Sequence, residues 1–143
     1  MLRGLTTVTF FADDMPAARA WYTEVLGIEP YFERSADGRP AYLEWRIGDY
    51  QHELGVVDRR FAPRGRAEDP GGAITHWAVD DVEAAVERLV SLGATLHDPP
   101  IERGPGFVTA SVVDPFGNIV GVMFNQHYLD VLESCTPAEA ATP

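Results

Sequence analysis

The chain has 143 residues, and its 22 acidic and 11 basic side chains give a formal net charge of −11. All the basic residues are arginines, so Schiff-base catalysis through a lysine amine is excluded. The acidic balance argues against nucleic acid and against an anionic membrane surface as partners. A single cysteine, Cys135, and the lack of any apolar run of 18 residues lead us to expect a cytoplasmic protein.

The first half of the chain predicts a strand, a helix and a pair of strands. An apolar run ends at Asp13-Asp14, and Asp14 suits the N-cap of the helix that follows. That helix is predicted to end at Gly27, because glycine readily adopts the left-handed conformation of a C-terminal cap. The alternating segments 41–47 and 51–57, joined by a short turn, then predict a β-hairpin.

The second half repeats this order 67 residues later. Asp80-Asp81 again closes an apolar run, and the helix after it is predicted to end at Gly93. Residues 107–113 and 119–124 then predict a second hairpin. The repeated unit is therefore a strand, a helix and two or three strands.

The repeat predicts one domain, 1–128, followed by a C-terminal tail, 129–143. Within the domain, module one spans 4–57, a linker spans 58–72 and module two spans 73–124. The linker carries four of the eleven arginines, which we expect to be solvated. The rest of the domain is therefore more acidic than the net charge suggests.

Four motifs together resemble the vicinal-oxygen-chelate superfamily: GLTTVTFFADD, WYTEVLG, VDDVEAAVERLVSLGA and VVDPFGN. This group includes glyoxalase I, extradiol dioxygenases and bleomycin-resistance proteins. The resemblance runs from about Gly4 to Phe124, and the Asp-Pro-Phe-Gly-Asn turn is its most specific part. It implies an α+β fold of two tandem βαβββ modules that curl a sheet around a cavity, with the helices outside. It also implies a homodimer.

The same resemblance allows a test for a metal centre. Metal-dependent members take ligands from the first and last strand of each module, usually histidine and glutamate. Counting back from the two helix caps gives Thr7 and Ile74 on the first strands, and the corresponding positions on the last strands hold Gly55 and Gly121. None of these offers the imidazole, thiolate or carboxylate that a transition metal prefers. A rival register supplies only Glu53 and His76, so we expect no metal and no cofactor.

Strand alternation predicts instead a polar face that lines the cavity. The candidate ligand-binding residues on it are Thr7, Thr9, Tyr42, Glu44, Glu53 and His76. Arg46 is expected on the same face. Gly55 and Gly121 are expected to enlarge the cavity floor, because a strand glycine often marks the close approach of a ligand.

Three functions remain open, and the first is a metal-independent small-molecule-binding protein of the glyoxalase/bleomycin-resistance type. Its acidic charge favours a polar or cationic organic ligand. The alternative is a lyase or isomerase that acts on a small oxygenated substrate, with Glu53 or His76 as the acid–base residue. The third is an accessory subunit with a vestigial cavity.

Overall fold

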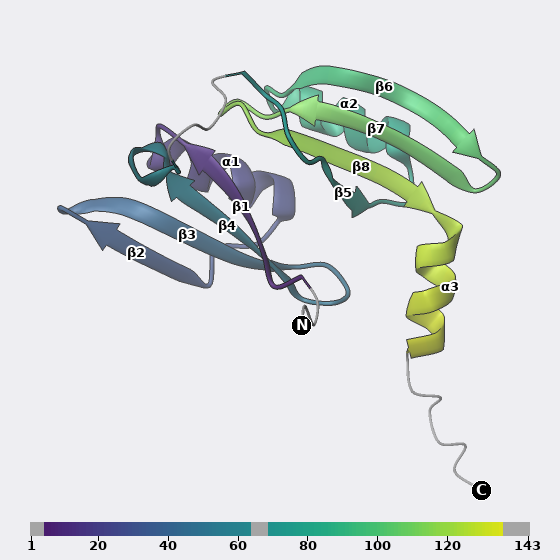
Figure 1. Cartoon of the computed structure of the whole chain (residues 1–143), viewed down its shortest axis with the longest axis horizontal. Helices are drawn as coiled ribbons and strands as arrows, with labels where there is room; N and C mark the ends of the chain where they lie inside the picture. The colour runs from purple at the N-terminus through teal and green to yellow at the C-terminus, as the bar shows by residue number, and fades with distance from the viewer. Residues whose placement is uncertain (1–4, 64–68, 136–143) are drawn as a thin grey trace, which may run out of the picture.

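The computed structural model describes residues 5–63 and 69–135 and shows two modules with the same order of elements (Figure 1). The first contains β1 (Thr7–Ala12), α1 (Met15–Leu26), β2 (Phe32–Ala36), β3 (Arg39–Ile47) and β4 (His52–Asp58). A 3₁₀ turn, η1 (Arg59–Phe61), follows. The second contains β5 (Thr75–Ala78), α2 (Val82–Ser91), β6 (Thr95–Gly104), β7 (Phe107–Val113) and β8 (Ile119–Asn125).

Each module forms a four-stranded mixed sheet. The strand order is β1-β4-β3-β2 in the first sheet and β5-β8-β7-β6 in the second. The first strand of each module pairs in parallel with the last, and the other pairs are antiparallel. The predicted α+β fold of two tandem βαβββ modules is thus confirmed, and the two predicted hairpins are β3–β4 and β7–β8.

The predicted N-caps of both helices and the glycine C-cap of α1 are also confirmed, whereas the C-cap of α2 is Leu92, one residue before the predicted Gly93. The Asp14 carboxylate accepts the backbone N–H of Ala17 at 2.9 Å, and Asp81 accepts that of Ala84 at 2.8 Å. These bonds satisfy donors that the first helical turn leaves unpaired. Gly27 ends α1 with φ at 70°, the left-handed conformation expected of a glycine cap.

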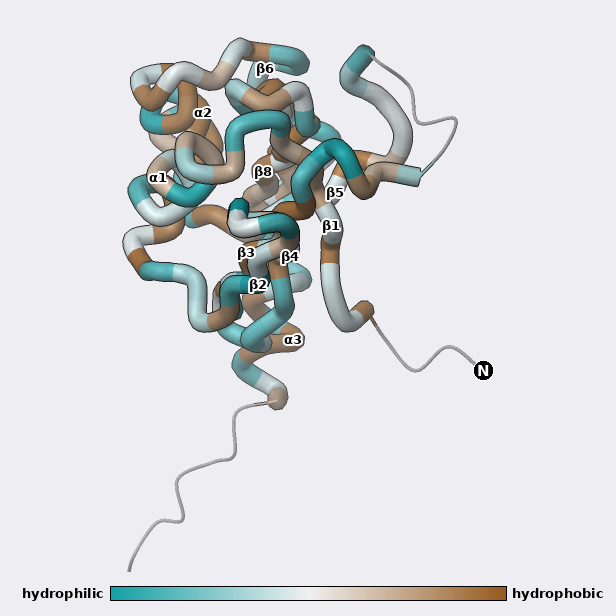
Figure 2. Tube along the Cα trace, turned by 90° about the vertical axis from the view of Figure 1, so that its left-hand side faces the viewer, coloured by the Kyte–Doolittle hydropathy of each residue, from teal (hydrophilic) through white to brown (hydrophobic). Residues whose placement is uncertain are grey.

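The core lies between each sheet and its helix. Leu43 and Trp45 of β3, and Leu54 and Val56 of β4, are completely buried on the helix side of the first sheet. Their polar neighbours point to the opposite, open face, as strand alternation predicts. Helices α1 and α2 lie next to each other (Figure 2). The indole N–H of Trp21 on α1 donates to the backbone oxygen of Leu92, which follows α2 in the second module. One continuous core therefore spans both modules.

The turn between β7 and β8 joins the second module to the first. The Tyr22 hydroxyl of α1 donates to the Asp114 carboxylate at 2.5 Å. Asn118 exchanges two hydrogen bonds of 3.0 Å with the backbone N–H and C=O of Phe11 in β1. Burial, followed by the charge of Asp114, raises the pKa of Tyr22 well above its ordinary value. The tyrosine therefore stays protonated and acts as a donor.

The linker arginines were expected to be solvated, and this is wrong for Arg59. Its side chain is 28% exposed, its Nε lies 2.9 Å from Asp13, and it donates to the backbone oxygen of Phe116. Arg59 therefore forms a second polar connection between the modules, in addition to the Tyr22–Asp114 hydrogen bond. Arg60 pairs with Asp58 at the end of β4.

A helix that the sequence analysis did not predict follows β8. This helix, α3 (Gln126–Cys135), projects from the end of the second sheet (Figure 1). Its Tyr128 hydroxyl donates to the Asp49 carboxylate, in the β3–β4 turn, at 2.9 Å. Residues 136–143 of the expected tail lie outside the described residues. No helix in the described part of the chain is long and apolar enough to cross a membrane.

Replacing Tyr22 by phenylalanine should weaken the junction between the modules. Tyr22→Phe removes a donor from the buried Asp114 carboxylate, and an unmet buried acceptor costs about 1–3 kcal/mol. We expect the free energy of unfolding in urea to fall by about that amount. Tyr50→Phe is the control, because this ring is 39% exposed. Equal effects of the two changes would contradict the assigned role of Tyr22.

Candidate functional site

Four of the six predicted ligand-binding residues lie together on the open face of the first sheet. The Thr7 hydroxyl donates to Glu53 at 3.1 Å, and the Tyr42 hydroxyl donates to Glu44. The β1–β4 pairing places Thr7 directly beside Glu53, and the β3–β4 pairing places Glu44 beside Gly55. The register of the sheet thus brings the two carboxylates onto adjacent strands.

Tyr31 completes this group, and the sequence analysis missed it. Its hydroxyl donates to Glu44 and lies 3.1 Å from an oxygen of Glu53. Tyr31 precedes β2 and is held there by a backbone bond from its N–H to the Glu44 carbonyl, at 3.0 Å. It lies outside any alternating segment, so periodicity gives no signal for it. We call Thr7, Tyr31, Tyr42, Glu44 and Glu53 the tyrosine–carboxylate cluster.

The two tyrosines of the cluster are proton donors at neutral pH. The hydrogen bond to Glu44, followed by desolvation, raises the pKa of Tyr31 to about 12. Burial, followed by its hydrogen bond to Glu44, raises the pKa of Tyr42 well above its ordinary value. The cluster therefore offers two oriented carboxylates. The nearby cation is Arg46, whose guanidinium lies 3.7 Å from Glu53 and 4.4 Å above the Tyr31 ring.

The remaining two predicted residues are not in the cluster. Thr9 is exposed on the same face of β1, where it pairs with Gly55. His76 belongs to the second sheet, where it pairs with Gly121, and it too is exposed. Among the described residues, no hydrogen bond joins either side chain to the cluster.

The two strand glycines do not enlarge a cavity, and this expectation is wrong. A β-carbon on Gly55 would lie 2.7 Å from the Tyr42 hydroxyl oxygen. A β-carbon on Gly121 would lie 2.8 Å from the His76 ring and 2.9 Å from Ile74. Each glycine instead makes room for a neighbouring side chain to lie across its strand.

The residues present do not fit the metal centre of metal-dependent relatives. Thr7, Gly55, Ile74 and Gly121 occupy the expected ligand positions, and none offers an imidazole or a carboxylate. In residues 5–63 and 69–135, no group of three or more His, Cys, Asp or Glu side chains could hold a metal ion.

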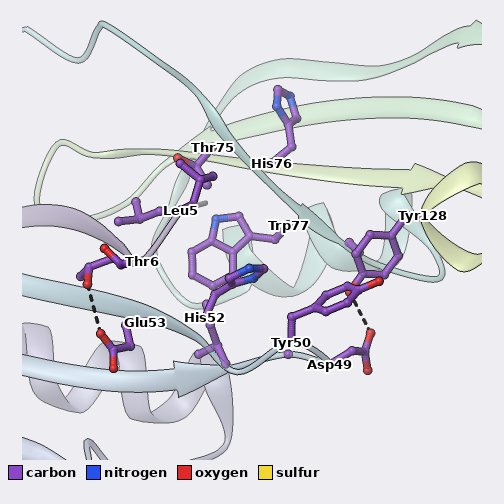
Figure 3. A pocket seen from close by; sticks show the side chains of 15 residues that line it. Leu5, Thr6, Asp49, Tyr50, His52, Glu53, Thr75, His76, Trp77 and Tyr128 are labelled. Atoms are coloured by element: carbon purple, nitrogen blue, oxygen red, sulfur yellow. Dashed lines mark hydrogen bonds between the residues drawn. The ribbon is translucent and has the colours of Figure 1, made fainter. Parts of the chain in front are cut away.

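A pocket of about 270 Å³ lies between the modules (Figure 3). It is bordered by the start of β1, the β3–β4 turn, β5 and the first turn of α3. Thr7 and Glu53 line one side of this inter-module pocket, so it is continuous with the tyrosine–carboxylate cluster. Its aromatic lining consists of Tyr50, His52, His76, Trp77 and Tyr128, so His76 borders this pocket as well as the second sheet's open face.

The open face of the second sheet has a different chemistry. A pocket of about 360 Å³ there is lined by His76 and by residues of β6 and β7. The buried Ser111 hydroxyl donates to Asp98 at 3.2 Å, and Arg103 donates to the Thr109 hydroxyl at 3.1 Å. The two sheet faces are therefore built alike but carry different polar groups.

The fold and the sequence both match a known group of proteins. The family model described as "Glyoxalase/Bleomycin resistance protein/Dioxygenase superfamily" matches residues 4–122. The chain belongs to this superfamily. A superfamily member of known structure, a glyoxalase-related enzyme from Fulvimarina pelagi, has a TM-score of 0.67 and 24% identity, covering 87% of this chain and 89% of that one.

Two further structures show the same fold. Lactoylglutathione lyase from Agrobacterium tumefaciens has a TM-score of 0.62 and 23% identity, covering 85% of this chain and 93% of that one. TioX from Micromonospora sp. ML1 has a TM-score of 0.62 and 18% identity, covering 85% of this chain and 98% of that one. These likenesses show the fold alone, so function must be argued from the site.

A curated relative is similar over most of this chain. The anthracycline biosynthesis protein DauV of Streptomyces sp. (strain C5) is 29% identical over 116 residues, which are 77% of this chain. This match spans only 37% of the length of DauV.

The close packing around Gly121 leads us to expect that a larger residue there destabilises the protein. Gly121→Ala places a methyl group 2.9 Å from the Thr75 backbone oxygen, which cannot turn away as a side chain can. We expect a loss of about 1–3 kcal/mol in the free energy of unfolding. Gly104→Ala is the matched control, because no atom lies within 4 Å of a β-carbon there. Thermal unfolding curves of both variants measure the difference, and equal midpoints would refute the packing argument.

Proposed function

We propose that the protein binds a small organic ligand with a cationic or strongly polar group, and that it does so without a metal ion. The observation that carries the proposal is the tyrosine–carboxylate cluster on the open face of the first sheet. Tyr31 and Tyr42 hold Glu44, and Thr7 holds Glu53, so both carboxylates are oriented before a ligand arrives. Preorganised polar groups reduce the entropy that binding costs.

A cation gains two kinds of contact at the cluster. Carboxylate oxygens form charge-assisted hydrogen bonds with an ammonium group, and the tyrosine rings offer their faces to a positive charge. Arg46 offsets the negative charge only in part, because its side chain is 56% exposed and its ion pair with Glu53 is screened by water. A ligand cation can therefore displace this arginine at small cost.

The name of the similar DauV protein supports an organic natural product as the ligand class. Anthracyclines combine a flat polycyclic ring system with a basic amino sugar, which is protonated at neutral pH. DauV extends well beyond the matched region, so its name supports a ligand class here rather than a particular activity. Metal independence rests on Thr7, Gly55, Ile74 and Gly121, the residues at the four family ligand positions.

The proposal includes a homodimer in the cytoplasm. Thr9 and His76 lie exposed on the two open sheet faces, and a second copy would cover these faces and close the ligand site. The free thiol of Cys135 is exposed and suits a reducing compartment.

The alternative is a lyase or isomerase, and the position of His76 favours it. The imidazole lies exposed over Gly121 and lines the pocket on the open face of the second sheet, beside Asp98 and Arg103. Glu53 is a weaker candidate, because its oxygens already accept from Thr7 and Tyr31. An enzyme of this kind loses turnover on His76→Asn but still binds its substrate, whereas a binding protein turns over no bound compound in either form.

The cluster predicts how affinity for a cation responds to charge removal. Glu53→Gln keeps the shape of the side chain and removes its charge, so we expect about tenfold weaker binding of an amino-sugar anthracycline. Titration calorimetry gives the affinity, and the N-acetylated anthracycline, which lacks the charge, should bind both proteins alike. Glu87→Gln on the exposed side of α2 is the matched control.

Two results would overturn the proposal. One is equal anthracycline affinity in the Glu53→Gln variant and the unaltered protein. The other is a stoichiometric transition metal in the purified protein together with loss of ligand binding after EDTA treatment. Binding that survives EDTA supports metal independence.

The dimer makes a separate prediction about mass. The chain has a mass of 15.7 kDa, and we expect light scattering after size-exclusion chromatography to give twice this value. A charged side chain on an open face, such as Thr9→Arg, should shift the mass toward that of one chain. The exposed Ala20→Arg on α1 is the control. A monomeric mass for the unaltered protein contradicts the homodimer.

A further inference from the structure

The inter-module pocket lies where the two sheets present their edge strands to each other. β1 ends the first sheet, β5 ends the second, and residues 5–8 and 75–78 both line the pocket. The β3–β4 turn and α3 close it from a third side, as Figure 3 shows for Tyr50 and Tyr128. The volume of about 270 Å³ is close to the lower end of small-molecule sites, about 300–1,000 Å³.

Aromatic rings form one wall of this pocket. The Tyr50 ring lies 5.7 Å from the Tyr128 ring at an interplanar angle of 83°, and 5.7 Å from the His52 ring at 38°. The Tyr128 hydroxyl is held by Asp49, which fixes its ring in this position. Ring edges and faces arranged in this way favour another aromatic ring over an aliphatic chain of the same size.

Trp77 supplies a polar atom that lacks a partner. The indole N–H groups of the other two tryptophans are satisfied: Trp21 donates to the Leu92 carbonyl at 2.9 Å, and Trp45 to the Ile28 carbonyl at 3.1 Å. The N–H of Trp77 is buried and has no acceptor among the described residues. A buried donor without an acceptor carries a desolvation cost that a ligand oxygen can remove.

From these contacts we infer that the inter-module pocket binds a flat aromatic ligand carrying a ring carbonyl. The ring stacks against Tyr50 and Tyr128, and its carbonyl oxygen accepts the N–H of Trp77. Because this N–H is buried, the ligand reaches it only when neighbouring side chains move, and the pocket wall includes one side chain, Leu5, that is 83% exposed. The inference needs no charge on the ligand and is independent of cation binding at the cluster.

Two neutral probes test the stacking of the ring and the hydrogen bond from Trp77. 9-Fluorenone and fluorene are flat tricyclic compounds of nearly the same shape, and only fluorenone has a carbonyl. We expect calorimetry or quenching of tryptophan fluorescence to show binding of both, with fluorenone about tenfold tighter. Trp77→Phe should abolish this preference and leave fluorene binding intact, which also shows that the variant is folded. Equal affinities in the unaltered protein would overturn the role of Trp77.

A second pair of variants tests the location. Ala78→Phe fills the pocket with a ring and should abolish binding of both probes. Ala84→Phe adds the same ring at an exposed position of α2 outside the pocket and should leave both affinities unchanged. Binding that survives Ala78→Phe, or no binding of either probe to the unaltered protein, overturns the site. The probes carry no charge, so either failure leaves the cation proposal unaffected.

Discussion

The arrangement of the whole molecule depends on the buried carboxylate of Asp114. It is 3% exposed and accepts the backbone N–H of Phe116 at 2.9 Å, and the backbone and side-chain N–H groups of Asn118 at 2.7 and 2.8 Å. Its remaining donor, Tyr22, comes from the other module. A buried charge is tolerated only when it is fully hydrogen-bonded, so α1 must remain where Tyr22 can reach. Asn118 then fixes β1 through Phe11, and this sets the gap between the edge strands.

The two modules have the same order of strands and helix, but the open faces of their sheets present different polar side chains. In both, a glycine in the last strand lets a neighbouring ring lie across the open face. In the first module that ring is Tyr42, which orients Glu44. In the second it is His76, beside a pocket that also contains Arg103. The two modules thus share the space above the last strand, and the side chain that fills this space determines the polarity of the face.

Local signals in the sequence predict most of this fold, because caps and strand faces depend on neighbouring residues. Asp14 and Asp81 cap their helices, and alternation separates the core from the open face. Tyr31 could not be predicted, since its contacts depend on the packing of β2 against β3. The helix α3 did leave a signal, because Leu129 and Leu132 recur at helical spacing and both are partly buried.

The inter-module pocket could not be predicted, because it exists only through the packing of one module on the other. The Trp77 ring contacts the core, but its strand, β5, is at the edge of the sheet, so Trp77 also borders the pocket.

The position of Glu53 connects the two proposed binding features. It pairs with Thr7 across β1 and β4, belongs to the tyrosine–carboxylate cluster and lines the inter-module pocket. A flat ring in the pocket therefore lies beside a carboxylate that can receive a basic substituent of the same molecule. Thr7 stands at a position where the superfamily resemblance predicts a histidine ligand in metal-dependent members, and here its hydroxyl orients Glu53 instead.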